Sequence, residues 1–245
     1  MAYDITKVAG MGTENLDEGS AMPFIRILQD LSPQLKPNKD EYVEGSKAGD
    51  LFFAKTKELL DNPVEMIPVY TTAMYTEWIP RNKGGGFVGS HPLSVVGNPL
   101  YEKGRERQYD EWLGDNELRY TSYWFVLVNV NGAWEEAMIP FTSSQLKVSR
   151  KLTSDINRFR YSDNPSIVPP LFAQKWQLAT VMETSKNNDD YWNFEIKSPL
   201  VLDFESDEDL LELAAATSGK AADTPLLQSP KEEKAPALTT DEDIF

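Results

Sequence analysis

Aromatic, basic and glycine residues lie close together in one segment of the chain, and this mixture suits contact with a single nucleic acid strand. Trp78 is followed by Arg81 and Lys83, then by three consecutive glycines, and then by Phe87. Aromatic faces stack on bases of any sequence at about 1–3 kcal/mol per base, and Arg and Lys neutralise phosphates. Glycines allow a strand to approach the backbone closely. The alternative is that Trp78 is a core residue followed by a hairpin loop.

A second group of cations lies in a predicted helix over residues 145–161. It consists of Lys147, Arg150, Lys151, Arg158 and Arg160, against Asp155 as the one acid. Such a basic group in an acidic protein favours phosphate contact. The alternative is a solvated helix face. Tyr70 and Tyr191, in the long predicted strands, complete the set of residues that we expect to contact DNA.

The chain ends in a short acidic and apolar segment, Asp241-Glu242-Asp243-Ile244-Phe245. Clustered carboxylates beside two large apolar side chains suit a basic groove that has a hydrophobic pocket. That groove can belong to another protein or to the body of this chain. The alternative is a solvated acidic tail, although solubility alone does not need Ile244 and Phe245.

The formal net charge of −15 is unevenly spread along the 245 residues. Residues 203–245 hold 12 acids and 3 bases, residues 1–20 hold 4 acids and 1 base, and the remainder holds 23 acids and 20 bases. A nearly neutral body therefore lies between acidic ends. Net charge alone does not exclude nucleic acid as a ligand, because the local distribution decides where an anion binds.

Several classes of site and protein are excluded or disfavoured by composition. The chain has no cysteine and one histidine, which rules out thiolate zinc sites, iron–sulfur clusters and multi-histidine metal sites. No catalytic motif is present, so we expect a protein without enzymatic activity, metal or cofactor. A nuclease with scattered carboxylate ligands stays open. We expect no signal peptide or membrane span, and a cytoplasmic location.

The predicted elements are mainly strands. Asn131-Gly132 between two apolar runs is a strong hairpin signal, and Pro68 indicates an edge or a bulge in its strand. Val148, Leu152 and Ile156 form one apolar helix face at a spacing of four. We predict strands at 51–54, 64–79, 119–130, 133–141, 172–184 and 191–197, and a helix at 145–161.

This order of elements predicts a mainly β fold. A helix that interrupts five or more antiparallel strands fits a five-stranded OB-type barrel with insertions better than a β-sandwich, which is the alternative. We expect a mobile arm over residues 1–20, an OB-type DNA-binding domain over 21–202, and a disordered acidic tail over 203–245. A short acidic helix over 204–213 and a linker over 217–240 are expected within this tail.

The tail resembles that of single-stranded DNA-binding proteins, which in bacteria ends in an acidic run and Asp-Ile-Pro-Phe; here Asp243-Ile244-Phe245 lacks the proline. Bacteriophage members also combine an OB body, an acidic tail and a terminal aromatic. Segments 77–91 and 141–147 are similar to phage proteins of this group as well. The resemblance covers the architecture of the body and the tail, and the tail is its most specific part.

The resemblance implies a sequence-independent single-stranded DNA-binding protein that acts in phage replication, recombination and repair. It implies that residues 241–245 recruit a DNA polymerase, a helicase or primase, or recombination proteins, and compete with DNA. A homodimer is compatible with it, and the location would be the bacterial host cytoplasm. The alternatives are a β-rich adaptor that binds no DNA and a metal-dependent nuclease.

Overall fold

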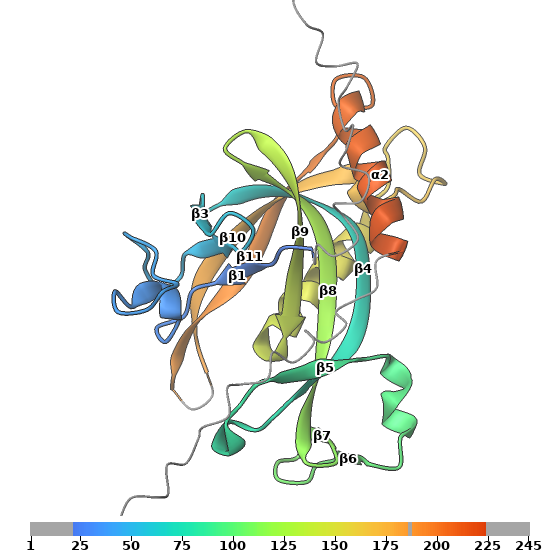
Figure 1. Cartoon of the computed structure of the whole chain (residues 1–245). Helices are drawn as coiled ribbons and strands as arrows, with labels where there is room; N and C mark the ends of the chain where they lie inside the picture. The colour runs from blue at the N-terminus through green and yellow to red at the C-terminus, as the bar shows by residue number, and fades with distance from the viewer. Residues whose placement is uncertain (1–21, 186–187, 224–245) are drawn as a thin grey trace, which may run out of the picture.

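A computed structural model describes residues 22–185 and 188–223 of the chain. Five long antiparallel strands form a strongly curled sheet (Figure 1). Their order across the sheet is β11-β10-β4-β8-β9. The five strands are β4 (Val64–Trp78), β8 (Asn116–Val130), β9 (Ala133–Thr142), β10 (Gln174–Thr184) and β11 (Asp190–Val201).

The connections between these strands follow those of an OB barrel. The first long strand, β4, pairs with the second, β8, and with the fourth, β10; β8 pairs with β9, and β10 pairs with β11. Helix α1 (Leu146–Arg158) lies between the third and fourth strands. The predicted mainly β fold with one helix between strands is therefore confirmed. The sandwich does not fit, because both long hairpins belong to one continuous sheet.

Alternating side chains of the long strands build two apolar layers. On β8, Trp124 and Val126 point into the barrel core, whereas Tyr123 and Phe125 belong to a second cluster on the outer face of the sheet. Both faces of β8 are buried over residues 123–128, which explains why this part of the strand is apolar throughout. The bulge that Pro68 predicts is present in the ladder between β4 and β8.

The gap between β9 and β11 is filled by a three-stranded N-terminal sheet. Phe24 pairs with Met138 of β9, and the side chain of Gln29 accepts from and donates to the backbone of Trp192 on β11, at 3.1 and 2.8 Å. Gly49, at φ +93°, packs so closely on Trp192 that a Cβ would lie 2.7 Å from the ring. The sheet comprises β1 (Ile25–Ile27), β2 (Leu51–Phe53) and β3 (Glu58–Leu60).

The outer cluster is covered by helix α2 (Glu208–Asp223). Ala214, Thr217 and Ala221 are buried at spacings of three and four, so small residues form the contact face of this helix. The expected boundary of the disordered tail at residue 203, and of a linker at 217, is therefore wrong. A segment rich in Ala, Ser and Gly has the composition of a linker, yet its helical spacing packs on the sheet.

A separate group of short elements lies between β4 and β8, at the end of the β4–β8 ribbon (Figure 1). We call residues 79–115 the distal lobe; its small core contains Val95, packed with Tyr75 and Leu118. Its strands are β5 (Phe87–His91), β6 (Tyr101–Lys103) and β7 (Glu111–Leu113). The 3-10 turns within the described residues are η2 (Pro33–Leu35), η3 (Arg81–Lys83), η4 (Leu93–Gly97), η5 (Ser143–Gln145) and η6 (Leu171–Ala173).

Candidate nucleic-acid interface

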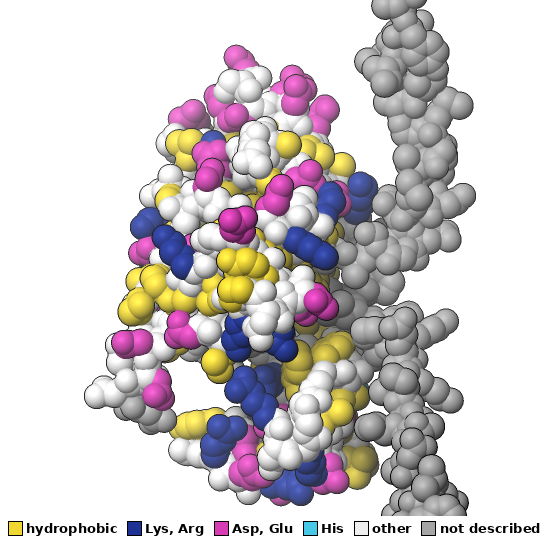
Figure 2. Space-filling view, turned by 60° about the vertical axis from the view of Figure 1, so that its left-hand side comes forward, with side chains coloured by type: hydrophobic (Ala, Val, Ile, Leu, Met, Phe, Trp, Pro, Cys, Tyr) yellow, Lys and Arg dark blue, Asp and Glu magenta, His cyan; other side chains and the backbone are white. Residues whose placement is uncertain are grey.

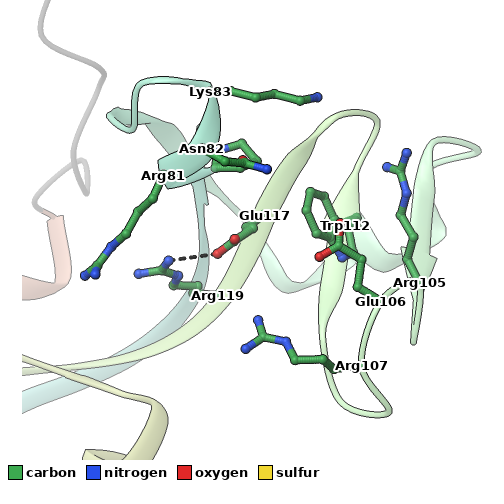
Figure 3. Close-up of a pocket in the computed structure, with 10 residues that line it drawn as sticks. Arg81, Asn82, Lys83, Arg105, Glu106, Arg107, Trp112, Glu117 and Arg119 are labelled. Carbon is green, nitrogen blue, oxygen red and sulfur yellow. Dashed lines mark hydrogen bonds and ion pairs between the residues drawn. The ribbon is translucent and has the colours of Figure 1, made fainter.

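A pocket of about 450 Å³ lies on the distal lobe. Turn η3 forms one side, the β6–β7 turn forms the other, and β8 lies between them (Figure 3). Five cationic side chains line it against two carboxylates, so the pocket is positive in an acidic protein. The lining residues are Pro80, Arg81, Asn82, Lys83, Arg105, Glu106, Arg107, Trp112, Glu117 and Arg119.

Local backbone structure positions the cations of both sides. Gly84, in a left-handed conformation at φ +106°, ends η3 directly after Lys83. On the other side, the carboxylate of Asp110 accepts hydrogen bonds from the backbone N–H groups of Glu106 and Arg107 and from the indole of Trp112, at 2.9–3.0 Å. One side chain therefore shapes the whole β6–β7 turn.

The protonation of Asp110 reflects this role. Burial raises the pKa of the Asp110 carboxyl, but the hydrogen bonds from Trp112 and from the backbone of Arg107 and Glu106 together outweigh burial and lower the pKa. The carboxylate is thus ionised at neutral pH and stays an acceptor for three donors. The turn that carries the arginines therefore keeps a charged acceptor at its centre at neutral pH.

The five cations differ in how strongly they are engaged. Lys83 and Arg105 both lie 3.7 Å from Asp115, and Arg105 also lies over the ring of Trp112 at 5.1 Å. Arg81 and Arg107 form no ion pair with any residue in the described part of the chain. These two guanidinium groups are therefore the most available partners for an incoming phosphate.

The fifth cation, Arg119, is held between an acid and an aromatic ring. It donates to Glu117 at 2.8 Å, and its guanidinium lies 5.5 Å from the ring centre of Trp78. Trp78 is half-buried, meets Phe87 edge to face at 5.3 Å and donates from its indole to Thr76 at 2.9 Å. Arg119 thus links the two halves of the predicted group, because it contacts Trp78 and lines the pocket together with Arg81 and Lys83.

The predicted basic helix forms a second group, on α1. Its apolar side packs on the barrel core through Leu152, and its cations lie on the exposed side. Arg150 and Arg158 form no ion pair among the described residues. Lys151 pairs with Asp155 at 2.7 Å. Just past the end of the helix, Arg160 donates to the carbonyl oxygens of Asn157 and Phe159.

Lys147 and the predicted aromatic Tyr191 meet at Glu183, beside the β10–β11 turn. One carboxylate oxygen of Glu183 accepts from Lys147 at 2.6 Å, from the Tyr191 hydroxyl at 2.7 Å and from Asn193 at 2.9 Å. Burial raises the pKa of Glu183, but these three hydrogen bonds outweigh it and lower the pKa. The hydrogen bond to Glu183 also raises the pKa of Lys147.

The two groups lie on different surfaces. Ser122 of β8 hydrogen-bonds Ser149 of α1 at 2.9 Å, whereas Arg119, an odd number of residues away on the same strand, points to the opposite face. Tyr70 lies apart from both groups: it packs on Phe125 at 5.6 Å in the outer cluster. The predicted partner-binding residues 241–245 lie outside the described residues.

Six of the ten residues that line the pocket were not singled out from the sequence. Residues 97–117 are rich in Gly, Glu and Arg without a clear period, so their short strands and the turn between them were not predicted. The usable signal was the density of arginine beside one tryptophan. The residues in question are Arg105, Glu106, Arg107, Trp112, Glu117 and Arg119.

The positions of the lobe and the hairpin agree with the way OB barrels bind. In that fold, the loop between strands one and two and the loop between strands four and five flank the oligonucleotide. Here these loops are the distal lobe and the β10–β11 turn, which project from the same end of the barrel (Figure 1). Figure 2 shows Lys and Arg side chains gathered beside an open hollow at this end.

Two further properties of residues 22–185 and 188–223 concern metal ions and membranes. No group of three or more His, Cys, Asp or Glu side chains there is arranged to hold a metal ion. No helix within those residues has the length and apolar character that a membrane crossing requires.

Comparison with known protein families identifies the family of this chain. A family profile described as Pam3 phage gp34-like protein matches residues 2–223, which is nearly the whole chain. No curated protein and no solved structure matches significantly. The matched span includes the barrel, the distal lobe and α2. The chain therefore belongs to the Pam3 phage gp34-like protein family and is a bacteriophage protein.

Proposed function

We propose that this phage protein binds single-stranded DNA without sequence preference and without cleaving it, and that it acts in phage DNA replication, recombination and repair. The observation that carries the proposal is the position of the cationic pocket. The pocket lies on the connection between the first and second strands of an OB-type barrel, where this fold places its oligonucleotide contacts.

The chemistry of the pocket supports a phosphate backbone as the ligand. Arginine guanidinium groups bind phosphate oxygens in pairs of hydrogen bonds, and two of the pocket arginines, Arg81 and Arg107, have no ion pair among the described residues. Trp78 and Phe87 lie beside the pocket and supply aromatic surface for bases. Contacts of this kind do not read a base sequence, which supports binding of any single strand.

The acidic net charge is compatible with this proposal, because most of the excess negative charge lies in residues 1–20 (net −3) and 203–245 (net −9). We propose that the terminal residues 241–245 recruit a DNA polymerase, a helicase or primase, or a recombination protein in the host cytoplasm. The same acidic tail competes with DNA for the cationic surface. Clustered carboxylates followed by Ile244 and Phe245 suit a basic groove with an apolar pocket.

The proposal is tested by fluorescence anisotropy with 5′-labelled oligo-dT, a mixed-sequence strand and a duplex of equal length. We expect similar affinity for both single strands, weaker binding to the duplex, and affinity that falls as salt rises. Incubation of the labelled strand with magnesium tests the nuclease alternative. Absence of binding to any strand at low salt would reject the proposal in favour of a protein adaptor.

A further inference from the structure

Trp78 is separated from the pocket by the side chain of Arg119. The pocket is lined by Arg119 and by Glu117, but not by Trp78, although Trp78 pairs with Glu117 across the β4–β8 ladder. The guanidinium of Arg119 lies 5.5 Å from the ring centre of Trp78, and its Nη2 donates to Glu117 at 2.8 Å. In the free protein a base therefore cannot stack on this face of Trp78 unless Arg119 moves.

We propose that Glu117 holds Arg119 over Trp78 in the free protein, and that a DNA phosphate displaces Glu117 as the partner of Arg119. The movement of Arg119 toward the phosphate then exposes the indole of Trp78 to a base. This inference rests on the proposed function, and it assigns Glu117 and Arg119 as residues that couple phosphate binding to base stacking.

The geometry favours such an exchange. Glu117 and Arg119 lie two residues apart on β8, so both side chains are on one face of the strand. Their side chains are 22% and 41% exposed, so water screens the ion pair and makes it weak. A phosphate offers the same kind of anionic oxygen acceptors as the carboxylate and can bind a guanidinium with two hydrogen bonds. Arg81 lines the same pocket without an ion pair to Glu117, and its charge adds attraction for an incoming phosphate.

The other side of Trp78 explains why one residue can control access. Phe87 meets the ring edge to face at 5.3 Å, and the indole N–H is fixed to Thr76 at 2.9 Å. Thr76 is itself bonded to Thr121 at 3.1 Å, which anchors the ring in the sheet. Thr76 and Phe87 therefore hold the ring of Trp78 in place, and Arg119 is the neighbour that can move.

The test compares Glu117→Gln with Glu106→Gln. Both substitutions remove one negative charge from the same pocket, but Glu106 forms no ion pair with Arg119. Releasing Arg119 from a half-exposed ion pair should tighten oligo-dT binding about two- to fivefold more in Glu117→Gln than in Glu106→Gln. Equal gains in the two variants would mean that Glu117 acts only through its charge, which would overturn the inference.

A second readout follows the indole N–H signal of Trp78 by NMR, assigned by its loss in Trp78→Phe. In the wild type, addition of oligo-dT or inorganic tripolyphosphate should shift this signal. Without any ligand, the signal of the Glu117→Gln variant should already be shifted in the same direction relative to the free wild type. The signal of the ligand-free Glu106→Gln variant should not be shifted. If oligo-dT binds but leaves the Trp78 signal unmoved, the inference fails and the proposed function stands. If oligo-dT does not bind, the proposed function fails, and the inference that rests on it fails as well.

Discussion

Replacing Trp78 by alanine should affect both stability and DNA binding, by amounts that the structure allows us to separate. Truncation of a fully buried tryptophan costs about 3–5 kcal/mol. Trp78 is half-buried, so we expect roughly 2 kcal/mol, including its edge-to-face contact with Phe87. A domain with a typical stability of about 5–15 kcal/mol stays folded after such a loss. Loss of one base stack should lower affinity by about 1–3 kcal/mol.

The assay combines thermal melting with an oligo-dT titration at a temperature well below the melting transition. Trp78→Phe is the matched control, since it keeps an aromatic face but loses the indole hydrogen bond to Thr76. We expect Trp78→Phe to lower the melting temperature slightly and to retain most of the affinity. A Trp78→Ala variant with a lower melting temperature and unchanged affinity would assign Trp78 to structure alone and refute its stacking role.

Three further predictions concern other parts of the molecule. If helix α1 contacts the strand, Arg150→Gln with Arg158→Gln should reduce the magnitude of the log–log salt slope by about 1.4, because each neutralised phosphate contributes about 0.7 for single strands; an unchanged slope would assign α1 to solvent. The lowered pKa of Glu183 stabilises the fold at pH values above the unfolded pKa of about 4.3, and this stabilisation is lost as pH falls through the folded pKa. Glu183→Gln should therefore lower the melting temperature at pH 7 and much less at pH 3, and equal losses at both pH values would contradict the ion-pair role. Deletion of residues 241–245 should tighten oligo-dT binding at low salt and abolish partner recruitment, with a gain that shrinks as salt rises; an unchanged affinity would leave the tail as a partner-binding segment only.

The barrel could be predicted from the sequence because its strands carry strong local signals. The apolar run of β8, the Asn131-Gly132 turn and the apolar stripe of α1 each specify one element, and each is found in the structure. The pairing of the strands then follows from the order of the elements along the chain, three long strands, a helix and a second hairpin, which is typical of an OB-type barrel. Burial on both faces of β8 strengthened the signal, since every residue from Tyr123 to Val128 is apolar.

The distal lobe could not be predicted in the same way. Its strands are three to five residues long, and side-chain contacts fix them as much as apolar patterning does. Glu77, for example, is buried and hydrogen-bonds both His91 and Asn116 at 2.6 Å. His91 lies in β5 and pairs with Tyr75 of β4, so this contact joins the lobe to the long ribbon. Six of the ten pocket residues were missed because the lobe lacks strong local signals.

Helix α2 shows the opposite error. Its Ala-, Ser- and Gly-containing sequence has few large apolar residues, and composition alone predicts a linker. The contact with the sheet depends on small side chains at Ala214 and Ala221, which let the helix approach closely. Only the spacing of these residues indicates a helix that packs on the sheet, and such spacing is weak evidence when the residues are small.

The central claim, that the pocket of the distal lobe binds single-stranded DNA, is tested most directly by one titration of labelled oligo-dT at low salt. It compares the wild type with a double pocket variant, Arg81→Gln with Arg107→Gln. The control is a second double variant, Lys36→Gln with Lys39→Gln, which has the same net charge as the pocket variant but changes the loop between β1 and β2. We predict saturable binding by the wild type, a loss of about tenfold or more in the pocket variant, and less than about twofold in the control. Equal weakening in both variants, or no binding by the wild type, would contradict the claim.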